Sequence, residues 1–368
     1  MRWLIIVMLT MWLVGCGGSD YTTDGNNMDY NSPEQNSTEN NASIQPIKDP
    51  YFYTQWYLDR NDSFYEQNDI DINASIHFDV SSPLRGRGVT IAIIDDGLDT
   101  THPDLNGSIV ATFDVESGGT NVSPTNRYDY HGTAVTGIIA ADRNTIGITG
   151  IASQSRIVFL KHKEGMSDSD TIELFMKAKE LGADIVNCSW GTYDVSDAVK
   201  DVIIDLAIHG RDGKGMVIVF AAGNDDRDMG NDESAIPEVI AVGSTDRGNL
   251  RAWYSNYGKN LDIVAPGGYE VGISTLDPSG ENGIAEINED YLLANDANAF
   301  VGTSASAPIV TGVIALMLEK NPDLTRKEIE EILHNSSDEI GSLDYINGFN
   351  EYYGYGKVNA RKILNTVR

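Results

Sequence analysis

The stretch VTIAIIDDGLDTTHPDL, from Val89 to Leu105, begins with an apolar, β-branched run and then turns acidic. Because polar residues do not alternate with apolar ones from Val89 to Ile94, this run predicts a strand buried on both faces, as in a parallel sheet. Asp95 would lie at the end of that strand, where its carboxylate faces a crevice but is shielded by apolar neighbours. A single aspartate in such a place is also an ordinary loop cap, so Asp95 alone does not indicate a function.

Further apolar runs follow along the chain and alternate with longer segments of helical spacing. The predicted strands are Val89–Ile94, Arg156–Leu160, Asp184–Cys188, Met216–Ala221 and Val239–Val242, and the predicted helices are Thr133–Ala141, Thr171–Leu181, Ala198–His209 and Ala307–Glu319. This alternation is typical of the α/β class, in which a mostly parallel sheet lies between helices. Ligands of such folds bind beyond the carboxyl ends of the strands.

Two later segments place reactive side chains at helix starts. His131 opens HGTAVTGIIAA, in which Gly132 permits close packing and the small and apolar residues predict a buried helix. Ser304 lies in GTSASAPIVTGVIALMLEKNPDL, with Pro308 expected in the first turn of a second apolar helix. Taken singly, His131 is more often a structural or capping histidine, and Ser304 a plain N-cap.

A fourth segment, VIVFAAGND from Val217 to Asp225, is a buried strand that ends in Ala-Gly-Asn. It would aim the Asn224 amide at the same crevice, although a Gly-Asn turn alone is common. A serine is a poor nucleophile without a base, and the base needs an acceptor on its other nitrogen to hold its tautomer. The four segments together therefore indicate a nucleophilic serine with its base and orienting acid, which none of them indicates alone.

These four segments, in this order and context, resemble the subtilase family over about Asp49 to Leu364. The resemblance implies a three-layer fold with a central, mostly parallel sheet and helices on both faces. It also implies a serine endopeptidase of polypeptides, in which Asp95 orients His131, and His131 takes the proton from Ser304. Ser304 attacks the peptide carbonyl, and Asn224 with the Ser304 backbone N–H stabilises the oxyanion.

Several details resemble the kexin and proprotein-convertase branch of that family, which favours cleavage after basic residues. They are DPYFYTQWYL (Asp49 to Leu58), the Asp95-Asp96-Gly97 triplet, NCSWG (Asn187 to Gly191) and LEKNPDLT (Leu318 to Thr325). The resemblance assigns substrate binding to Ser189, Trp190 and Gly191, the S2 carboxylate to Asp96 and the S1 carboxylate to Asp194. The branch's acidic, cysteine-containing loop is replaced by residues 225–233, where Asp232 is a further candidate for an S1 acid. Asp194 could equally be a solvated loop residue.

The segment DRNTIGITG, from Asp142 to Gly150, resembles the strong-calcium loop of subtilases. The implied ligands of Ca²⁺ are the Asn144 side chain, the backbone carbonyls of Asp142, Ile146 and Ile148, and the carboxylates of Asp104 and Asp49. A set of oxygen ligands suits this hard cation. The sequence predicts no zinc site.

The chain of 368 residues carries a formal net charge of -29, from 55 acidic and 26 basic side chains. Such a field repels nucleic acid and favours basic ligands or cations, so we expect no nucleic-acid partner. Acidity that simply keeps an exported surface soluble explains the same charge.

Residues 1–15 combine Arg2 with a short apolar run and predict a signal peptide. Leu13 to Cys16 resembles the lipobox of bacterial lipoproteins, which implies a lipidated Cys16 and a protein anchored to the bacterial cell envelope, outside the cytoplasm. Residues 16–48 are rich in polar residues and poor in apolar ones, which predicts a disordered tether. Only Cys188 then remains, so we expect no intramolecular disulfide.

We expect a peptidase domain over residues 49–368, with neither a propeptide domain nor a P-domain. A separate inhibitor or folding chaperone would then supply the propeptide's role, unless the enzyme folds unaided or is restrained otherwise. The main alternative is a lipid-anchored, catalytically idle binding protein on a subtilase scaffold, against which the complete set of Asp95, His131 and Ser304 argues. Serine-carboxyl peptidases would require acidic residues in place of His131 and Asn224.

Overall fold

The computed structural model describes residues 47–105, 107–285 and 289–368. The predicted signal peptide, Cys16 and nearly all of the predicted tether lie outside these ranges. Within the ranges, none of the helices combines the length and the apolar character needed to cross a membrane.

Among the described residues, seven parallel strands form one sheet in the order β2-β3-β1-β4-β5-β6-β7. Five of these strands, β1, β4, β5, β6 and β7, consist entirely of buried residues, as the apolar runs predict for all of them except β7, which was not predicted. A separate antiparallel pair is formed by β8 and β9. The bounds are β1 Thr90–Asp95, β2 Ile109–Asp114, β3 Arg156–Lys161, β4 Ile185–Cys188, β5 Val217–Ala221, β6 Ile240–Thr245, β7 Ile263–Pro266, β8 Thr275–Leu276 and β9 Tyr291–Leu292.

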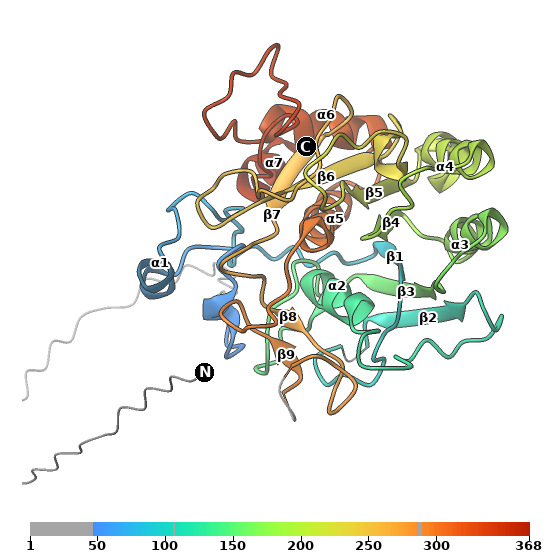
Figure 1. The fold of residues 1–368 in the computed structure, drawn as a ribbon, viewed down its shortest axis with the longest axis horizontal. Helices are drawn as coiled ribbons and strands as arrows, with labels where there is room; N and C mark the ends of the chain where they lie inside the picture. The colour runs from blue at the N-terminus through green and yellow to red at the C-terminus, as the bar shows by residue number, and fades with distance from the viewer. Residues whose placement is uncertain (1–46, 106, 286–288) are drawn as a thin grey trace, which may run out of the picture. The chain divides into compact units, whose positions relative to one another are not determined.

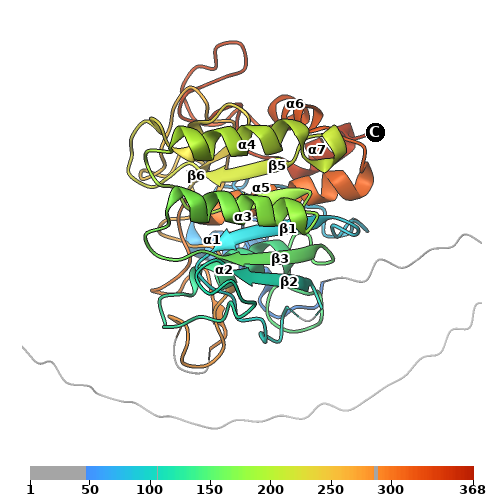
Figure 2. The same ribbon diagram turned by 90° about the vertical axis from the view of Figure 1, so that its right-hand side faces the viewer.

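Helices cover both faces of the sheet, with α3 and α4 on one side and α2 and α5 on the other (Figures 1 and 2). Alternate residues of β1 enter the two apolar cores: Ile91 and Ile93 pack with α2 and α5, whereas Ala92 and Ile94 pack with α3 and α4. The predicted three-layer α/β class is therefore confirmed. The helices are α1 Asp62–Asn68, α2 His131–Ala140, α3 Asp168–Glu180, α4 Asp197–His209, α5 Thr303–Lys320, α6 Arg326–Ser336 and α7 Ala360–Thr366, with short 3₁₀ helices at Phe52–Thr54, Arg211–Gly213 and Glu233–Ala235.

The last long apolar helix begins earlier than its pattern predicts. The sequence suggests a start at Ala307, whereas α5 begins at Thr303, so Pro308 lies inside the helix and not in its first turn. A proline has no N–H to donate to the carbonyl four residues earlier, which here is that of Ser304. That carbonyl instead accepts a hydrogen bond from Ser189 Oγ at 3.0 Å. The helix therefore tolerates the proline because a side chain from another segment replaces the missing donor.

The segment before the sheet packs as an arm on the rest of the fold. Trp56, Tyr57 and Leu58 are fully buried. The Trp56 indole N–H donates to the Gly272 carbonyl at 2.7 Å, and the Tyr57 hydroxyl donates to the Ser274 carbonyl at 3.1 Å. The aromatic residues of this arm thus join the main core.

Candidate active site

Asp95 and His131 meet at the carboxyl end of strand β1. Asp95 is the last residue of β1 and His131 the first of α2, and the Asp95 Oδ1 to His131 Nδ1 distance is 2.7 Å. The approach of α2 to β1 requires Gly132, since a Cβ atom there would lie 2.4 Å from the Gly97 carbonyl oxygen and 2.6 Å from the Phe159 ring. The pair that the sequence predicts is therefore in contact.

Burial and charge act in opposite directions on this pair. Burial disfavours the charged carboxylate, but the attraction of His131 and its hydrogen bond hold the pKa of Asp95 below its ordinary value. Burial likewise disfavours the charged imidazole. The attraction of the Asp95 carboxylate outweighs this effect of burial and raises the pKa of His131. Asp95 Oδ2 is buried and has no hydrogen-bond partner within the described ranges. The aspartate thus stays ionised and orients the ring through Oδ1 alone.

Ser304 follows the strained start of α5. Gly302, with φ of 122°, turns the chain into the helix, and this conformation favours glycine. Ser304 Oγ donates to the Ser189 carbonyl at 3.0 Å, so its hydroxyl is held by the segment after β4. Among the described residues no hydrogen bond joins Ser304 to His131. A rotation about the Cα–Cβ bond would turn the hydroxyl from Ser189 toward another acceptor.

The Asn224 amide is oriented by the same turn. Its Oδ1 accepts from the Thr303 backbone N–H at 2.9 Å and from Thr303 Oγ1 at 3.0 Å. No hydrogen bond within the described part of the chain uses the Nδ2 group. The backbone N–H of Ser304 lies in the first turn of α5, where no carbonyl of the helix can accept from it. Two donors that could serve an oxyanion therefore flank the hydroxyl.

A cavity of about 250 Å³ lies beside Ser304 and Asn224. The structure brings into its wall the predicted substrate-binding residues Ser189, Trp190 and Gly191, and the Trp190 indole N–H is anchored on the Ile94 carbonyl at 2.8 Å. The wall consists of Ser189, Trp190, Gly191, Tyr193, Ala221, Gly223, Asn224, Arg227, Met229, Asp232, Asn256, Thr303 and Ser304.

Asp232 supplies the carboxylate of this cavity. It is 6% exposed, and it accepts from the Tyr193 backbone N–H at 2.8 Å and from Ser234 Oγ at 2.9 Å. Gly191 leaves the carboxylate uncovered, because a Cβ atom there would lie 2.6 Å from Asp232 Oδ2. Asp194, by contrast, is exposed, accepts from Asn231 Nδ2 at 2.7 Å and lies outside the cavity wall.

Arg227 is a cavity residue that the sequence did not reveal. Its guanidinium lies over the Tyr193 ring at 4.4 Å and within 3.6 Å of Asp225. Asn256, also missed, fixes the turn that carries Arg227, since its Oδ1 accepts from the backbone N–H groups of Asp225 and Arg227 at 2.9 and 3.2 Å. No motif contains either residue, so only the fold identifies them.

Asp96, the predicted S2 acid, lies next to the catalytic pair. Its Oδ1 accepts from the Gly132 backbone N–H at 2.8 Å, which leaves its other oxygen for a ligand. Burial, followed by repulsion from Asp95, raises the pKa of Asp96 to about 7. A cationic side chain beside Asp96 would favour its ionised form.

The predicted calcium ligands converge around the 142–150 loop. Asp49 accepts from the backbone N–H groups of Asn144 and Thr145 at 3.1 and 2.7 Å, and Asp104 accepts from Asn144 Nδ2 at 2.9 Å and from the Ile148 N–H at 3.1 Å. Burial, with smaller contributions from Asp49 and Asp142, raises the pKa of Asp104 to about 7. The charges of Asp49 and Asp142 thus act repulsively on the Asp104 carboxylate.

The backbone of the same loop adds neutral oxygens. Hydrogen bonds among the described residues make no use of the carbonyl oxygens of Ile146 and Ile148. Gly147 has a φ of 54° and no room for a side chain, since a Cβ atom there would lie 2.3 Å from Asp104 Oδ2. Asp142 is joined to the group through its backbone N–H, which donates to the Asp104 carbonyl at 2.9 Å. Two carboxylates with an amide and free carbonyls fit a Ca²⁺ ion.

Comparison with known proteins agrees with this geometry. The Calcium-dependent protease of Nostoc sp. is 35% identical over 309 residues, which are 76% of this chain and 46% of that protein. Subtilisin of Bacillus pumilus is 32% identical over 292 residues, covering 76% of this chain and 92% of that protein. The Dibasic-processing endoprotease of Yarrowia lipolytica is 31% identical over 341 residues, which cover 86% of this chain and 34% of that protein. The chain thus spans about half the length of the calcium-dependent proteases it matches, 46% and 48%.

Solved structures share the fold. The serine protease of Aeromonas sobria, in a complex with its chaperone, has a TM-score of 0.75 at 20% identity, over 89% of this chain and 70% of that one, which supports the fold alone. A protease of Pseudoalteromonas arctica has a TM-score of 0.70 at 26% identity, over 88% of this chain and 100% of that one. The family model described as "Subtilase family" matches residues 86–356. The chain therefore belongs to the subtilase family.

Proposed function

We propose that this protein is a serine endopeptidase that hydrolyses peptide bonds through an acyl-enzyme. The observation that carries the proposal is the contact of Asp95 with His131, and the Asn224 amide, with its Nδ2 unused, is held at the start of the helix that carries Ser304. In the reaction, Ser304 Oγ turns from the Ser189 carbonyl to His131 Nε2, loses its proton to that nitrogen and attacks the substrate carbonyl carbon. Asn224 Nδ2 and the Ser304 N–H donate to the oxyanion.

The later steps complete acylation and then hydrolyse the acyl-enzyme. His131 gives the proton to the leaving amine as the peptide C–N bond breaks and the acyl-enzyme forms. Water then loses a proton to His131 and attacks the ester, and the returning proton restores the Ser304 hydroxyl. Asp95 stabilises the imidazolium in both steps without taking up the proton.

Cleavage after basic residues is the specificity that we propose. Asp232 supports it, because a Lys or Arg side chain entering the cavity would reach a fixed, uncovered carboxylate. Asp96 would add a second carboxylate for a basic residue one place earlier in the substrate. The name of the Yarrowia lipolytica relative, a dibasic-processing endoprotease, supports the same specificity. Arg227 acts against it, but its charge is turned toward Asp225 and the Tyr193 ring.

Calcium is the cofactor that we propose for the 142–150 loop. Asp49, Asp104, Asn144 and the loop carbonyls would hold it, and the name of the Nostoc relative supports calcium dependence. Bound Ca²⁺ would supply positive charge between the carboxylates. The expected benefit is stability, because the arm before the sheet and the loop after α2 would be tied to one ion.

Attachment to the bacterial envelope through Cys16 is a further proposal, supported by the lipobox-like residues 13–16. Metabolic labelling with a fatty-acid probe should mark the wild-type protein and not Cys16→Ser, and equal labelling of both would refute the anchor. A separate folding chaperone stays a prediction. Equal refolding yields with and without cellular extract would count against it.

Labelling with a fluorophosphonate probe in calcium buffer tests the catalytic proposal. The wild-type protein should be labelled, and Ser304→Ala should not. Ser306→Ala is the matched control, because Ser306 lies on the same helix but its hydroxyl donates to the Ala265 carbonyl at 3.0 Å. A folded wild-type protein without Ser304-dependent labelling would refute the protease and leave the idle binding protein.

A further inference from the structure

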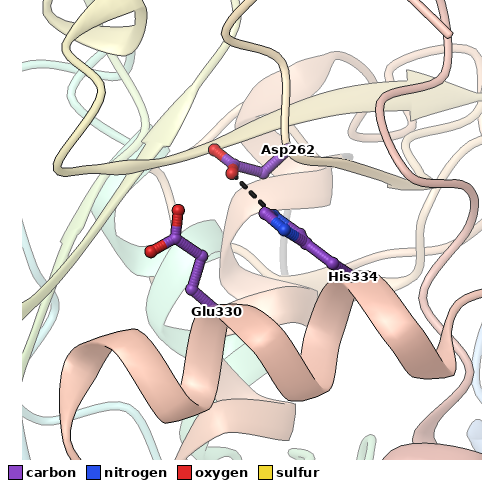
Figure 3. A group of neighbouring side chains, drawn as sticks. All are labelled: Asp262, Glu330 and His334. Atoms are coloured by element: carbon purple, nitrogen blue, oxygen red, sulfur yellow. Dashed lines mark hydrogen bonds and ion pairs between the residues drawn. The ribbon is translucent and has the colours of Figure 1, made fainter. Parts of the chain in front are cut away.

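A second group of polar side chains converges away from the catalytic residues. Glu330 and His334 lie four residues apart on α6 and so share one face of the helix, and Asp262 directly precedes β7. Figure 3 shows both helical side chains turned toward Asp262. One ligating atom from each residue lies within 4.8 Å of the others, beside a cavity of about 440 Å³.

Each side chain is held in place by a partner that leaves one ligating atom facing the group. Asp262 Oδ2 accepts from the Ala241 N–H at 2.8 Å, so Oδ1 faces His334 Nε2, also at 2.8 Å. The His334 ring stacks on Tyr355 with centroids 3.7 Å apart. Glu330 Oε2 accepts from Arg326 at 2.8 Å, which leaves Oε1. Outer partners of this kind orient metal ligands.

The local charge also favours a cation. The side chains of Asp262, His334 and Glu330 are 11%, 16% and 22% exposed, so two carboxylates lie together in a largely buried place with Arg326 as the cationic partner of Glu330. Burial, followed by repulsion from Asp262, raises the pKa of Glu330. A divalent ion between the carboxylates would remove that repulsion.

We propose that Asp262, Glu330 and His334 form a binding site for a divalent transition-metal ion. One imidazole nitrogen and two carboxylates suit Zn²⁺, whereas Ca²⁺ prefers oxygen ligands alone. Binding would replace the His334–Asp262 hydrogen bond, with the imidazole neutral and its proton on Nδ1, and the adjoining cavity leaves space for water as a fourth ligand.

The position of the site indicates a structural role. Asp262 lies at the amino end of β7, whereas Asp95 is the last residue of β1 and Asn224 follows the carboxyl end of β5. In a parallel sheet these ends are opposite edges. A metal ion here would therefore fasten α6 to the edge of the sheet without touching the substrate.

Calorimetric titration of Zn²⁺ into the full chain tests the proposal, with Ser304→Ala to prevent self-cleavage and with Ca²⁺ present in excess to fill the oxygen-only loop. We expect one Zn²⁺ per chain, and Glu330→Gln should weaken its affinity about tenfold or more. Glu330→Gln keeps the His334–Asp262 pair and an acceptor for Arg326, so it should fold, which its melting temperature without metal would verify. The melting temperature should rise with Zn²⁺ only where the site is intact.

His209→Gln is the matched control. His209 pairs with Asp205 at 2.9 Å with the same spacing on α4, but both side chains are exposed and the described residues place no third ligand beside them. Its removal should leave Zn²⁺ affinity unchanged. No Zn²⁺ binding by the parent chain, or equal affinity in the parent and in Glu330→Gln, would overturn the proposal. Neither result depends on proteolytic activity.

Discussion

Replacing Asp232 by asparagine should change the specificity of the enzyme and leave its chemistry intact. Asp232 lies in the wall of the cavity beside Ser304, whereas Asp95, His131 and Ser304 lie at the carboxyl end of β1, the start of α2 and the start of α5. The substitution keeps the size of the side chain and removes its charge. Asparagine can still accept from the Tyr193 N–H, so the loop should keep its position.

The magnitude follows from the contact that a basic substrate would lose. A hydrogen bond to a charged partner contributes about 1.5–3 kcal/mol, and each ~1.4 kcal/mol is a factor of ten. For a substrate with arginine before the cut, kcat/KM should fall about 10- to 150-fold. A substrate with leucine there should be almost unaffected, because leucine forms no hydrogen bond with the carboxylate. Any loss of acceptor capacity for Ser234 acts on both substrates alike and so cancels in the ratio of their kcat/KM values.

The assay compares kcat/KM for two fluorogenic peptides that differ only in arginine or leucine at that position. Asp194→Asn is the matched control, since that carboxylate is exposed and outside the cavity wall, and it should change the ratio less than about threefold, as expected of a solvated charge. If the arginine-to-leucine ratio is the same in wild type and Asp232→Asn, the basic specificity is wrong. A drop caused by Asp194→Asn instead would assign the acid to the residue that the sequence suggested.

Two other predictions concern the oxyanion and the calcium loop. Asn224→Ala should lower kcat about 100- to 1,000-fold with little change in KM, a magnitude established on subtilisin itself, and a loss below about tenfold would exclude Asn224 as a main donor. Because burial raises the pKa of Asp104 to about 7, Ca²⁺ binding should release a proton and weaken about tenfold per pH unit below 7. Without calcium, the free energy of unfolding should fall as pH rises from about 4 to 7, since the unfolded chain loses this proton first. Chemical denaturation and calcium titrations at pH 5.5 and 7.5 measure both effects, and a pH-independent affinity would contradict them.

The buried strands β1, β4, β5 and β6 could be predicted because their apolar runs are unbroken. β7 is equally buried but was not predicted, since Pro266 ends a run of only three apolar residues. β2 escaped prediction because its residues are mostly half-exposed and its pattern is weak. α6 was missed although its signal was present: Thr325 and Glu328 form a capping box, visible in the sequence as T-x-x-E before an amphipathic segment.

The residues of the candidate sites likewise fall into those that the sequence predicts and those that only the structure reveals. Asp95, His131, Ser304 and Asn224 could be predicted because each has flanking residues that repeat a known local pattern. The resemblance assigned the S1 carboxylate to Asp194, whereas the wall of the cavity contains Asp232, the further candidate. Asp262 and His334 are 72 residues apart, and no local signal connects them. Residues that meet only through the arrangement of whole elements cannot be paired from a single sequence.

Pro308 has a consequence for how tolerance to mutation should be interpreted in this protein. It has no N–H, and so it withholds the helical donor that would compete with Ser189 for the Ser304 carbonyl. A residue with an N–H there would offer the helix its ordinary bond and release Ser189 from the nucleophile's backbone. In a survey of all single substitutions, replacing Pro308 should therefore lower activity as replacing a catalytic residue does. A proline inside this helix would then be kept because activity depends on it.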